Sequence, residues 1–389
     1  MSERAPLLGN SPNAIHHAEP SFVSSFKYAL CSTYFNVFLI FVPLAITASF
    51  LKWSDTVVFT LNFLAIMPLA KLLGLATEEL ALRTGSTVGA LLNSTFGNAV
   101  ELILGFIALK EGLIRVVQAS ILGSMLSNIL LVLGFCFFLG GIYYPEQSFN
   151  VTAAQTSSSL LALTTLALLI PAAFSATSAS GDERIAGILN LSHATAICLL
   201  IIYVLFLFFQ LKTHNHLYEE EPDDEEQPQT TLMFSILLLV MIAALVSLHA
   251  EFLVGSIEGI VERWGINETF VGIILLPIVG NAAEHVSSVT FALKDKMNLC
   301  IGIAVASSLQ IGLLVTPLLV IAGWIIGQPM TLFFENFETV VLFSSVLIVN
   351  YLIADGKSNW LEGAMLLVAY TIIAIAFLFH PTNEPDIHS

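Results

Sequence analysis

The stretch GNAVE at residues 97–101 recurs as GNAAE at residues 280–284, at an offset of 183 residues (101 to 284). The same offset continues without a gap into the following apolar run, where it pairs Ser124 with Ser307. Apolar residues often match one another by chance. Two copies of the polar sequence Gly-Asn-Ala-x-Glu at one offset are not expected by chance. We therefore predict an internal repeat with a polar centre in each half.

The composition of the chain places both copies in a membrane. Of the 389 residues, 56% are hydrophobic and only 11% are charged, against about a quarter charged in a typical soluble domain. The mean hydropathy of +0.87 excludes a disordered chain, and the net charge of −16 argues against a nucleic-acid partner. The four cysteines lack CxxC spacing, so we expect neither a structural metal nor a redox pair.

Eleven apolar runs are long enough to cross a lipid bilayer, which takes about 20 residues of helix. Runs this long and this uniformly apolar are typical of helices rather than of barrel strands. The fold is therefore predicted to be an all-α polytopic membrane protein, with spans at residues 34–52, 56–75, 87–109, 116–141, 153–174, 185–211, 231–250, 269–293, 297–325, 331–354 and 359–379.

The repeat divides these spans into one leading helix and two five-helix units. We predict a cytosolic tail, a first transmembrane helix, repeat 1, an acidic cytosolic linker, repeat 2 and a C-terminal tail, at residues 1–33, 34–54, 55–211, 212–230, 231–379 and 380–389. Because five is odd, the second unit enters the membrane from the opposite side. Inverted repeats place a binding site near the midplane, where the two interrupted helices meet. Gly97, Gly280 and Pro277 are expected to loosen these helices and free carbonyl oxygens as ligands.

Glu101 and Glu284 each lie inside a span, where a charge costs about 2.5–3.5 kcal/mol and indicates a function. With the amide oxygens of Asn98 and Asn281, nearby hydroxyls and freed carbonyls, they form an all-oxygen site that suits Ca²⁺, and Mn²⁺ accepts the same ligands. One Ca²⁺ or two protons neutralise the pair, whereas an empty site holds two repelling, poorly solvated charges. We therefore predict an exchanger that changes access only when loaded, with its glutamates titrating as a coupled pair.

Two other classes of function fit this pattern less well. A passive Ca²⁺ channel usually has an acidic ring around one pore, whereas this chain offers one acidic pair on inverted repeats. An intramembrane enzyme would need a motif such as HExxH, a serine elbow or a P-loop, and the sequence contains none of them. We therefore predict a transporter with neither enzymatic activity nor an organic cofactor.

Basic residues and the N-terminal tail indicate the orientation. With a cytosolic N-terminus, eight of the 13 basic residues fall on the cytosolic side, as the positive-inside rule favours. These eight are Arg4, Lys27, Lys71, Arg83, Lys212, Lys294, Lys296 and Lys357. In the tail, Glu3 precedes Leu7-Leu8 in the pattern of an acidic dileucine signal, which a cytosolic sorting adaptor reads for lysosome-like or vacuolar delivery. Chance occurrence in a polar tail is the alternative.

The linker concentrates seven acidic residues within eight positions, namely Glu219, Glu220, Glu221, Asp223, Asp224, Glu225 and Glu226. They form either a solvated connection between the two halves or a cytosolic patch that senses or concentrates divalent cations. Pro222 and Pro228 interrupt any helix there. Glu78 and Glu79 precede the first motif and are expected to face the same side, as ion-access residues or as a solvated helix end.

The doubled motif resembles the alpha repeats of the calcium:cation antiporter superfamily, and its continuation into His285 resembles the calcium/proton exchanger branch. The resemblance covers the chain from the second span onward and is closest to fungal vacuolar calcium/proton exchangers. It implies a multi-pass vacuolar membrane protein that exchanges cytosolic Ca²⁺ for lumenal protons, with a linker that binds regulatory Ca²⁺. It also implies that the motif glutamates coordinate the ion, assisted by Asn98, Asn281, Ser127 and Gln310. The resemblance links His285 to proton coupling, whereas the residues alone equally predict an interhelical hydrogen bond.

Overall fold

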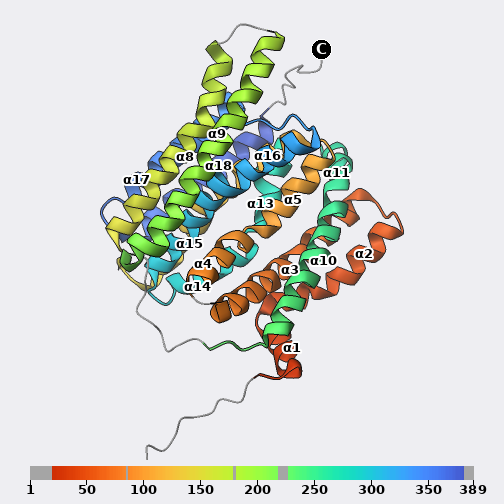
Figure 1. Cartoon of the computed structure of the whole chain (residues 1–389), viewed down its shortest axis with the longest axis vertical. Coiled ribbons are helices and arrows are strands. Elements are labelled where there is room, and N and C mark those ends of the chain that lie inside the picture. Colours follow the sequence, from red (N-terminus) through yellow and green to blue (C-terminus); the bar gives the residue numbers. More distant parts are fainter. Residues whose placement is uncertain (1–19, 85, 178–180, 218–226, 381–389) are drawn as a thin grey trace, which may run out of the picture.

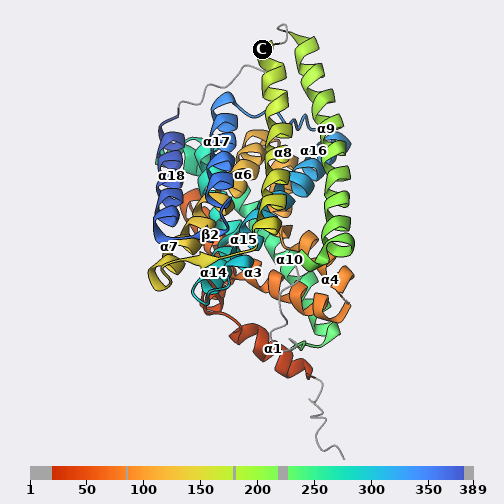
Figure 2. The same cartoon turned by 90° about the vertical axis from the view of Figure 1, so that its left-hand side faces the viewer.

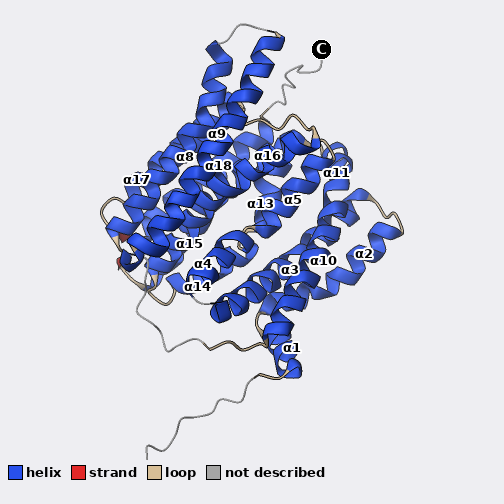
Figure 3. Cartoon of the chain, in the orientation of Figure 1, coloured by secondary structure: helices blue, strands red, loops and turns tan. Residues whose placement is uncertain are grey.

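The structure, a computed structural model, describes residues 20–84, 86–177, 181–217 and 227–380. Nearly all of these residues are helical, as Figure 3 shows. The helices pack into one bundle, beyond which the tips of α8 (Val151–Thr177) and α9 (Asp182–Phe208) project at one end (Figures 1 and 2). The prediction of an all-α polytopic fold is confirmed.

The first half of the chain contains one leading pair of helices and then the first repeat. A short helix, α1 (Phe22–Cys31), precedes the predicted first span, which is formed by η1 (Tyr34–Ile40) and α2 (Phe41–Phe50). The repeat follows as α3 (Asp55–Thr84), α4 (Ser86–Phe96), α5 (Ala99–Lys110), α6 (Ile114–Leu126), η2 (Ser127–Val132), α7 (Leu133–Tyr143), α8, α9 and η3 (Phe209–Thr213).

The second half repeats this order. After η4 (Asn215–Leu217), the helices are α10 (Leu232–Gly255), α11 (Ile257–Trp264), α12 (Glu268–Phe270), η5 (Val271–Leu275), α13 (Leu276–Gly280), α14 (Ala282–Ala292), α15 (Met297–Gln310), η6 (Ile311–Val315), α16 (Thr316–Ile326), α17 (Asn336–Leu352) and α18 (Trp360–Phe379). The two-residue strands β1 (Gln147–Ser148) and β2 (Lys357–Ser358) pair antiparallel and join the two halves.

All eleven predicted spans fall on helical segments, but fewer of them meet a strict length and hydropathy test. Seven described helices are long and apolar enough to cross a membrane, and nine are if each bent pair counts as one span. The remaining predicted spans correspond to the short helices α4 and α5 and to the 17-residue α17. Three boundaries were wrong by five residues or more: α3 continues to Thr84 instead of ending at residue 75, α10 continues to Gly255 instead of ending at residue 250, and α17 begins at Asn336 instead of residue 331.

Two helices carry a π-helical turn at equivalent places in the repeats. In the first half α6 passes into α7 through η2, and in the second half α15 passes into α16 through η6. Such turns occur often at functional sites, because they change which side chains face a neighbouring helix. The predicted site residues Ser127 and Gln310 lie where these two turns begin.

The α6–α7 helix forms the centre of the bundle, with 72% of its most apolar stretch buried against 22% for the peripheral α18. It packs closely on η5 because Gly123 has no side chain: a Cβ there would clash with the carbonyl oxygen of Ile273. On the other flank, α3 packs along α10 (Figure 1). The interrupted helices are thus held between a buried central helix and the α3–α10 pair.

Candidate cation-binding site

Both repeat motifs interrupt their helices at the asparagine. In the first half α4 ends at Phe96 and α5 begins at Ala99, with Asn98 between them at φ −106° and ψ 26°. In the second half Asn281 separates α13 from α14 at φ −88° and ψ 0°, and the helices on either side of it are bent by 60°. Each motif glutamate therefore lies in the first turn of a new helix, where the helix dipole favours a negative charge.

The second motif has an additional cause of interruption. Pro277 falls in the first turn of α13, directly after the π-helical turn η5. Proline has no N–H to donate to the preceding turn, so the backbone rearranges to satisfy the freed carbonyl. The predicted loosening at Pro277 is therefore present, and the equivalent segment of the first motif, which has no proline, stays within the regular helix α4.

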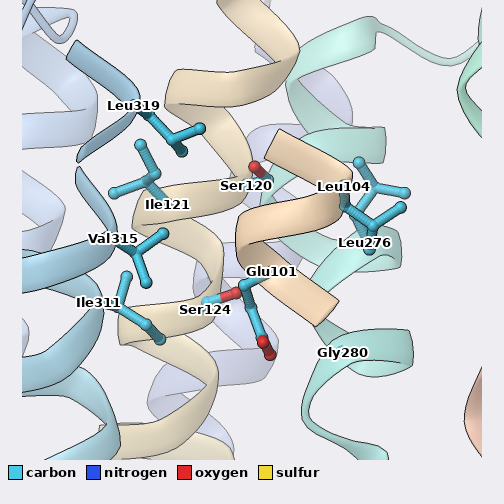
Figure 4. Close-up of a pocket in the computed structure, with 10 residues that line it drawn as sticks. All are labelled: Glu101, Leu104, Ser120, Ile121, Ser124, Leu276, Gly280, Ile311, Val315 and Leu319. Carbon is cyan, nitrogen blue, oxygen red and sulfur yellow. The ribbon is translucent and has the colours of Figure 1, made fainter. Parts of the chain in front are cut away.

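The two motifs, one from each repeat, lie next to each other in the bundle. Glu101 Oε1 approaches the backbone of the second motif so closely that a Cβ on Gly280 would lie 2.6 Å from it. Glu101 of the first motif therefore lies beside Gly280 of the second motif (Figure 4).

Three buried oxygens of the site accept no hydrogen bond from the described part of the chain. These are Glu101 Oε2, Glu284 Oε2 and Asn281 Oδ1. The other oxygen of Glu284, Oε1, accepts a hydrogen bond of 2.8 Å from Ser307 Oγ. Buried polar atoms normally have partners, so unsatisfied acceptors gathered on two neighbouring motifs indicate a place for a cation.

The remaining predicted ligands pair with one another in different ways. Asn98 Nδ2 donates a hydrogen bond to Gln310 Oε1, and this bond does not use the amide oxygen of Asn98. Ser127 Oγ lies 3.1 Å from His285 Nε2, so the motif histidine does form an interhelical hydrogen bond. Asn281 Nδ2 donates to the backbone oxygen of Ser124 at 3.4 Å.

The sequence analysis missed one contact of the site. Ser307 Oγ donates a hydrogen bond to Glu284 Oε1, whereas in the sequence Ser307 is evidence only for the repeat. The signal that could have identified it is the repeat, which pairs Ser307 with Ser124 and places both one helix after a motif glutamate. In the structure Ser124 lines the small cavity beside Glu101 (Figure 4).

A large cavity gives access to Glu284 from one end of the bundle. We call this end the linker side, because it carries Thr213 and Thr230 at the two ends of the linker. The cavity has a volume of about 1030 Å³. Its deep end is lined by Gly97, Gly280, Glu284, Ser307 and Gln310, and its outer part by Glu78, His216, Asp295 and Lys296.

Glu101 faces a second, much smaller cavity. Its volume is about 20 Å³, enough for roughly one water molecule. Apart from Ser120, Ser124 and Gly280, the residues around Glu101 are apolar: Leu104, Ile121, Leu276, Ile311, Val315 and Leu319 (Figure 4). The site is therefore wide open towards the linker side and closed by apolar side chains around Glu101.

The donors present fit a hard cation. In the described residues no group of three or more His, Cys, Asp or Glu side chains could hold a metal. Two carboxylates with amide, hydroxyl and backbone oxygens are the ligands that Ca²⁺ or Mn²⁺ accepts, whereas zinc and copper prefer thiolates and imidazoles.

The acidic residues proposed for the cytosolic side have different positions. Glu78 is exposed and lines the large cavity. Glu79 is buried, and its Oε2 accepts hydrogen bonds from the backbone N (2.8 Å) and Oγ1 (2.9 Å) of Thr230. Glu79 thus anchors the end of the linker to α3, which the sequence did not indicate. The acidic residues at 219–226 and the Leu7-Leu8 signal lie outside the described residues.

Comparisons with known proteins agree with this geometry. The profile of the family described as "Sodium/calcium exchanger protein" matches residues 54–212 and 234–379. The vacuolar calcium ion transporter of Schizosaccharomyces pombe is 48% identical over 385 residues, covering 97% of this chain and 93% of that protein. The Ca(2+)/H(+) antiporter of Synechocystis is 48% identical over 368 residues, covering 90% and 98%.

A solved structure has the same architecture. The native structure of YfkE superposes with a TM-score of 0.78 at 38% sequence identity, covering 89% of this chain and all of that one. A second structure of YfkE is described as a Ca2+/H+ antiporter. These relatives are transporters rather than enzymes. The chain belongs to the sodium/calcium exchanger family, in its Ca²⁺/H⁺ antiporter branch.

Proposed function

We propose that the protein exchanges cytosolic Ca²⁺ for lumenal protons across a vacuolar membrane by alternating access. In this proposal Glu101 and Glu284 bind either one Ca²⁺ or protons. The observation that carries it is the set of unsatisfied buried oxygens on Glu101, Glu284 and Asn281, where the two interrupted helices meet. An unpaired buried acceptor costs about 1–3 kcal/mol, and more if it is charged, so this arrangement favours a bound cation or proton.

Charge neutrality accounts for the coupling of the two ions. Ca²⁺ neutralises both carboxylates, and so do two protons, but an empty site keeps two like charges in poorly solvated surroundings. A change from one access state to the other is therefore unfavourable while the site is empty. Ca²⁺ movement in one direction is therefore tied to proton movement in the other.

The two cavities support alternating access. Glu284 is reached through the large linker-side cavity, while Glu101 is enclosed by apolar side chains. This is the shape expected of one access state, with the linker side facing the cytosol under the proposed orientation. A passive channel would need a continuous path, which the apolar closure around Glu101 does not support.

The names of the relatives support the choice of ions and membrane. The relatives include vacuolar calcium ion transporters and Ca(2+)/H(+) antiporters. Because Mn²⁺ accepts the same oxygen ligands, Mn²⁺/H⁺ exchange is the second candidate.

Ion flux into vesicles tests the proposal. A vesicle with an acidic interior should take up Ca²⁺ with simultaneous loss of its pH gradient, and Mn²⁺ and Na⁺ in competition should rank the substrates. Glu101→Gln and Glu284→Gln should each abolish uptake, because one remaining carboxylate cannot neutralise Ca²⁺. The exposed Glu111, near Lys110 in a loop, provides the matched control Glu111→Gln, which should transport normally. Proton-driven Ca²⁺ uptake retained by either site variant would refute the proposed roles.

The vacuolar destination rests in part on the dileucine pattern. If Leu7-Leu8 is the sorting signal, the double substitution Leu7→Ala and Leu8→Ala should redirect the protein to another membrane without changing its transport in isolated vesicles. Microscopy of the tagged full chain measures this. Unaltered vacuolar localisation would leave the pattern as a chance occurrence.

A further inference from the structure

Lys71 lies far deeper in the membrane-spanning region than its sequence indicates. The count of basic residues assigned it to the cytosolic side, near the predicted end of a span at residue 75. The helix α3 instead continues to Thr84, which places Lys71 about 20 Å from the linker-side end of that helix. A lysine at such depth is costly and usually marks a water-filled cavity or an ion pathway.

The lysine faces the same cavity as the site. Lys71 and Glu284 both line the large cavity, and next to Lys71 a Cβ on Gly74 would have nothing within 4 Å. Lys71 Nζ donates a hydrogen bond of 3.2 Å to Ser287 Oγ. Ser287 lies on α14, one turn after Glu284. A positive charge thus stands within the cation pathway, one helical turn from a proposed ligand.

The ammonium group is held by a hydroxyl rather than by a carboxylate. Within the described residues Lys71 forms no ion pair, whereas Lys110, Arg115 and Lys357 do. The Ser287 hydroxyl oxygen, one helical turn from Glu284, is also the kind of ligand that a small monovalent cation would use. Lys71 therefore occupies, with one positive charge, a place that Na⁺ could otherwise take.

We propose that the Lys71 ammonium acts as a fixed monovalent cation beside the Ca²⁺ site and so makes the exchanger insensitive to Na⁺. The inference rests on the proposed function. The ammonium weakens the attraction that the two carboxylates exert on any cation, and a monovalent ion, which they attract about half as strongly as a divalent one, is then held weakly. The ammonium also occupies the Ser287 oxygen that Na⁺ would need.

Replacing the charge tests the inference. Lys71→Met removes the charge and keeps the side-chain length, and Lys71→Arg keeps the charge as the matched control. In vesicles with an acidic interior, excess Na⁺ should raise the Ca²⁺ concentration for half-maximal uptake by about tenfold in Lys71→Met, relative to the same ionic strength of K⁺. Wild type and Lys71→Arg should not respond to Na⁺.

A binding readout covers the case in which Lys71→Met does not transport. Na⁺ that binds the folded full chain should raise its melting temperature in detergent above the value in K⁺, for Lys71→Met but not for wild type. If neither uptake nor melting of Lys71→Met responds to Na⁺ more than wild type does, the inference is wrong. Failure of wild-type proton-driven Ca²⁺ uptake would instead refute the proposed function, and the melting comparison separates the two outcomes.

Discussion

The two copies of the repeat motif have nearly the same sequence but different surroundings. Glu284 lines a cavity of about 1030 Å³ and accepts a hydrogen bond from Ser307. Glu101 lines a cavity of only about 20 Å³, and the other residues around that cavity are mainly apolar. Sequence symmetry makes the two environments interchangeable in principle. Under the proposed alternating access their difference corresponds to one access state, and the opposite state should exchange the roles of the two halves.

The largest expected difference between the halves is in solvent access. Gly302→Cys in the large cavity and Ser120→Cys in the small one should be compared after the exposed Cys31 and Cys198 are replaced by serine. A membrane-impermeant thiol reagent on the linker side should label position 302 about ten- to thousandfold faster, since an alternate state is typically populated at about 0.1–10%.

The rate of labelling, followed by mass spectrometry, measures this difference. The same reagent applied from the opposite side gives the control, because position 302 should then react slowly. Equal labelling rates at the two positions from the linker side would show that the asymmetry is not a property of the protein in a membrane.

Alanine substitutions at the paired glycines Gly97 and Gly280 should affect different properties, namely stability and Ca²⁺ binding. A Cβ on Gly280 would lie 2.6 Å from Glu101 Oε1, so Gly280→Ala should displace a ligand and weaken Ca²⁺ binding by roughly ten- to hundredfold, equivalent to about 1–3 kcal/mol. A Cβ on Gly97 would instead lie 2.6 Å from the backbone oxygen of Asn93, so Gly97→Ala should chiefly lower the melting temperature.

Calcium titration and thermal unfolding of both purified variants separate these effects. If Gly280→Ala binds Ca²⁺ as tightly as wild type, the position of the Glu101 carboxylate is not important for binding.

The smallest expected difference concerns the paired serines. Ser307→Ala removes the hydrogen bond to Glu284 and should raise the Ca²⁺ concentration for half-maximal uptake several-fold. Ser124→Ala should have less effect, because the contact of Ser124 with Asn281 is made by its backbone oxygen. Uptake measured over a range of Ca²⁺ concentrations tests this order. A larger effect at Ser124 would indicate that the opposite access state dominates in the vesicle.

Much of the architecture could be predicted because it follows from two simple features of the sequence. Hydropathy located the helical segments, and the exact recurrence of Gly-Asn-Ala-x-Glu identified the paired breaks that bring Glu101 near Gly280. The end of α3 was misplaced because charged residues such as Glu78 lower the hydropathy without ending a helix. That error also hid the depth of Lys71.

The asymmetry between the halves could not be predicted from the sequence. Both motifs contain the same glycine, asparagine and glutamate, so these shared residues do not specify which cavity is open. The contact between Glu79 and Thr230 joins residues 151 positions apart, and such a pair of common polar residues carries no signal in one sequence. The Ser307 contact was within reach of the repeat argument, but serine is frequent in these helices.

The two π-helical turns also bear on the history of the chain. A π-helical turn holds one residue more than the α-helical turn it replaces. The turns η2 and η6 coincide to within one residue under the repeat offset, and the repeats align through them without a gap. Duplication of a single half that already contained the extra residue would leave this gap-free coincidence. A protein made of two such halves, inserted in opposite directions, would already have had a π-helical turn on each side of its centre.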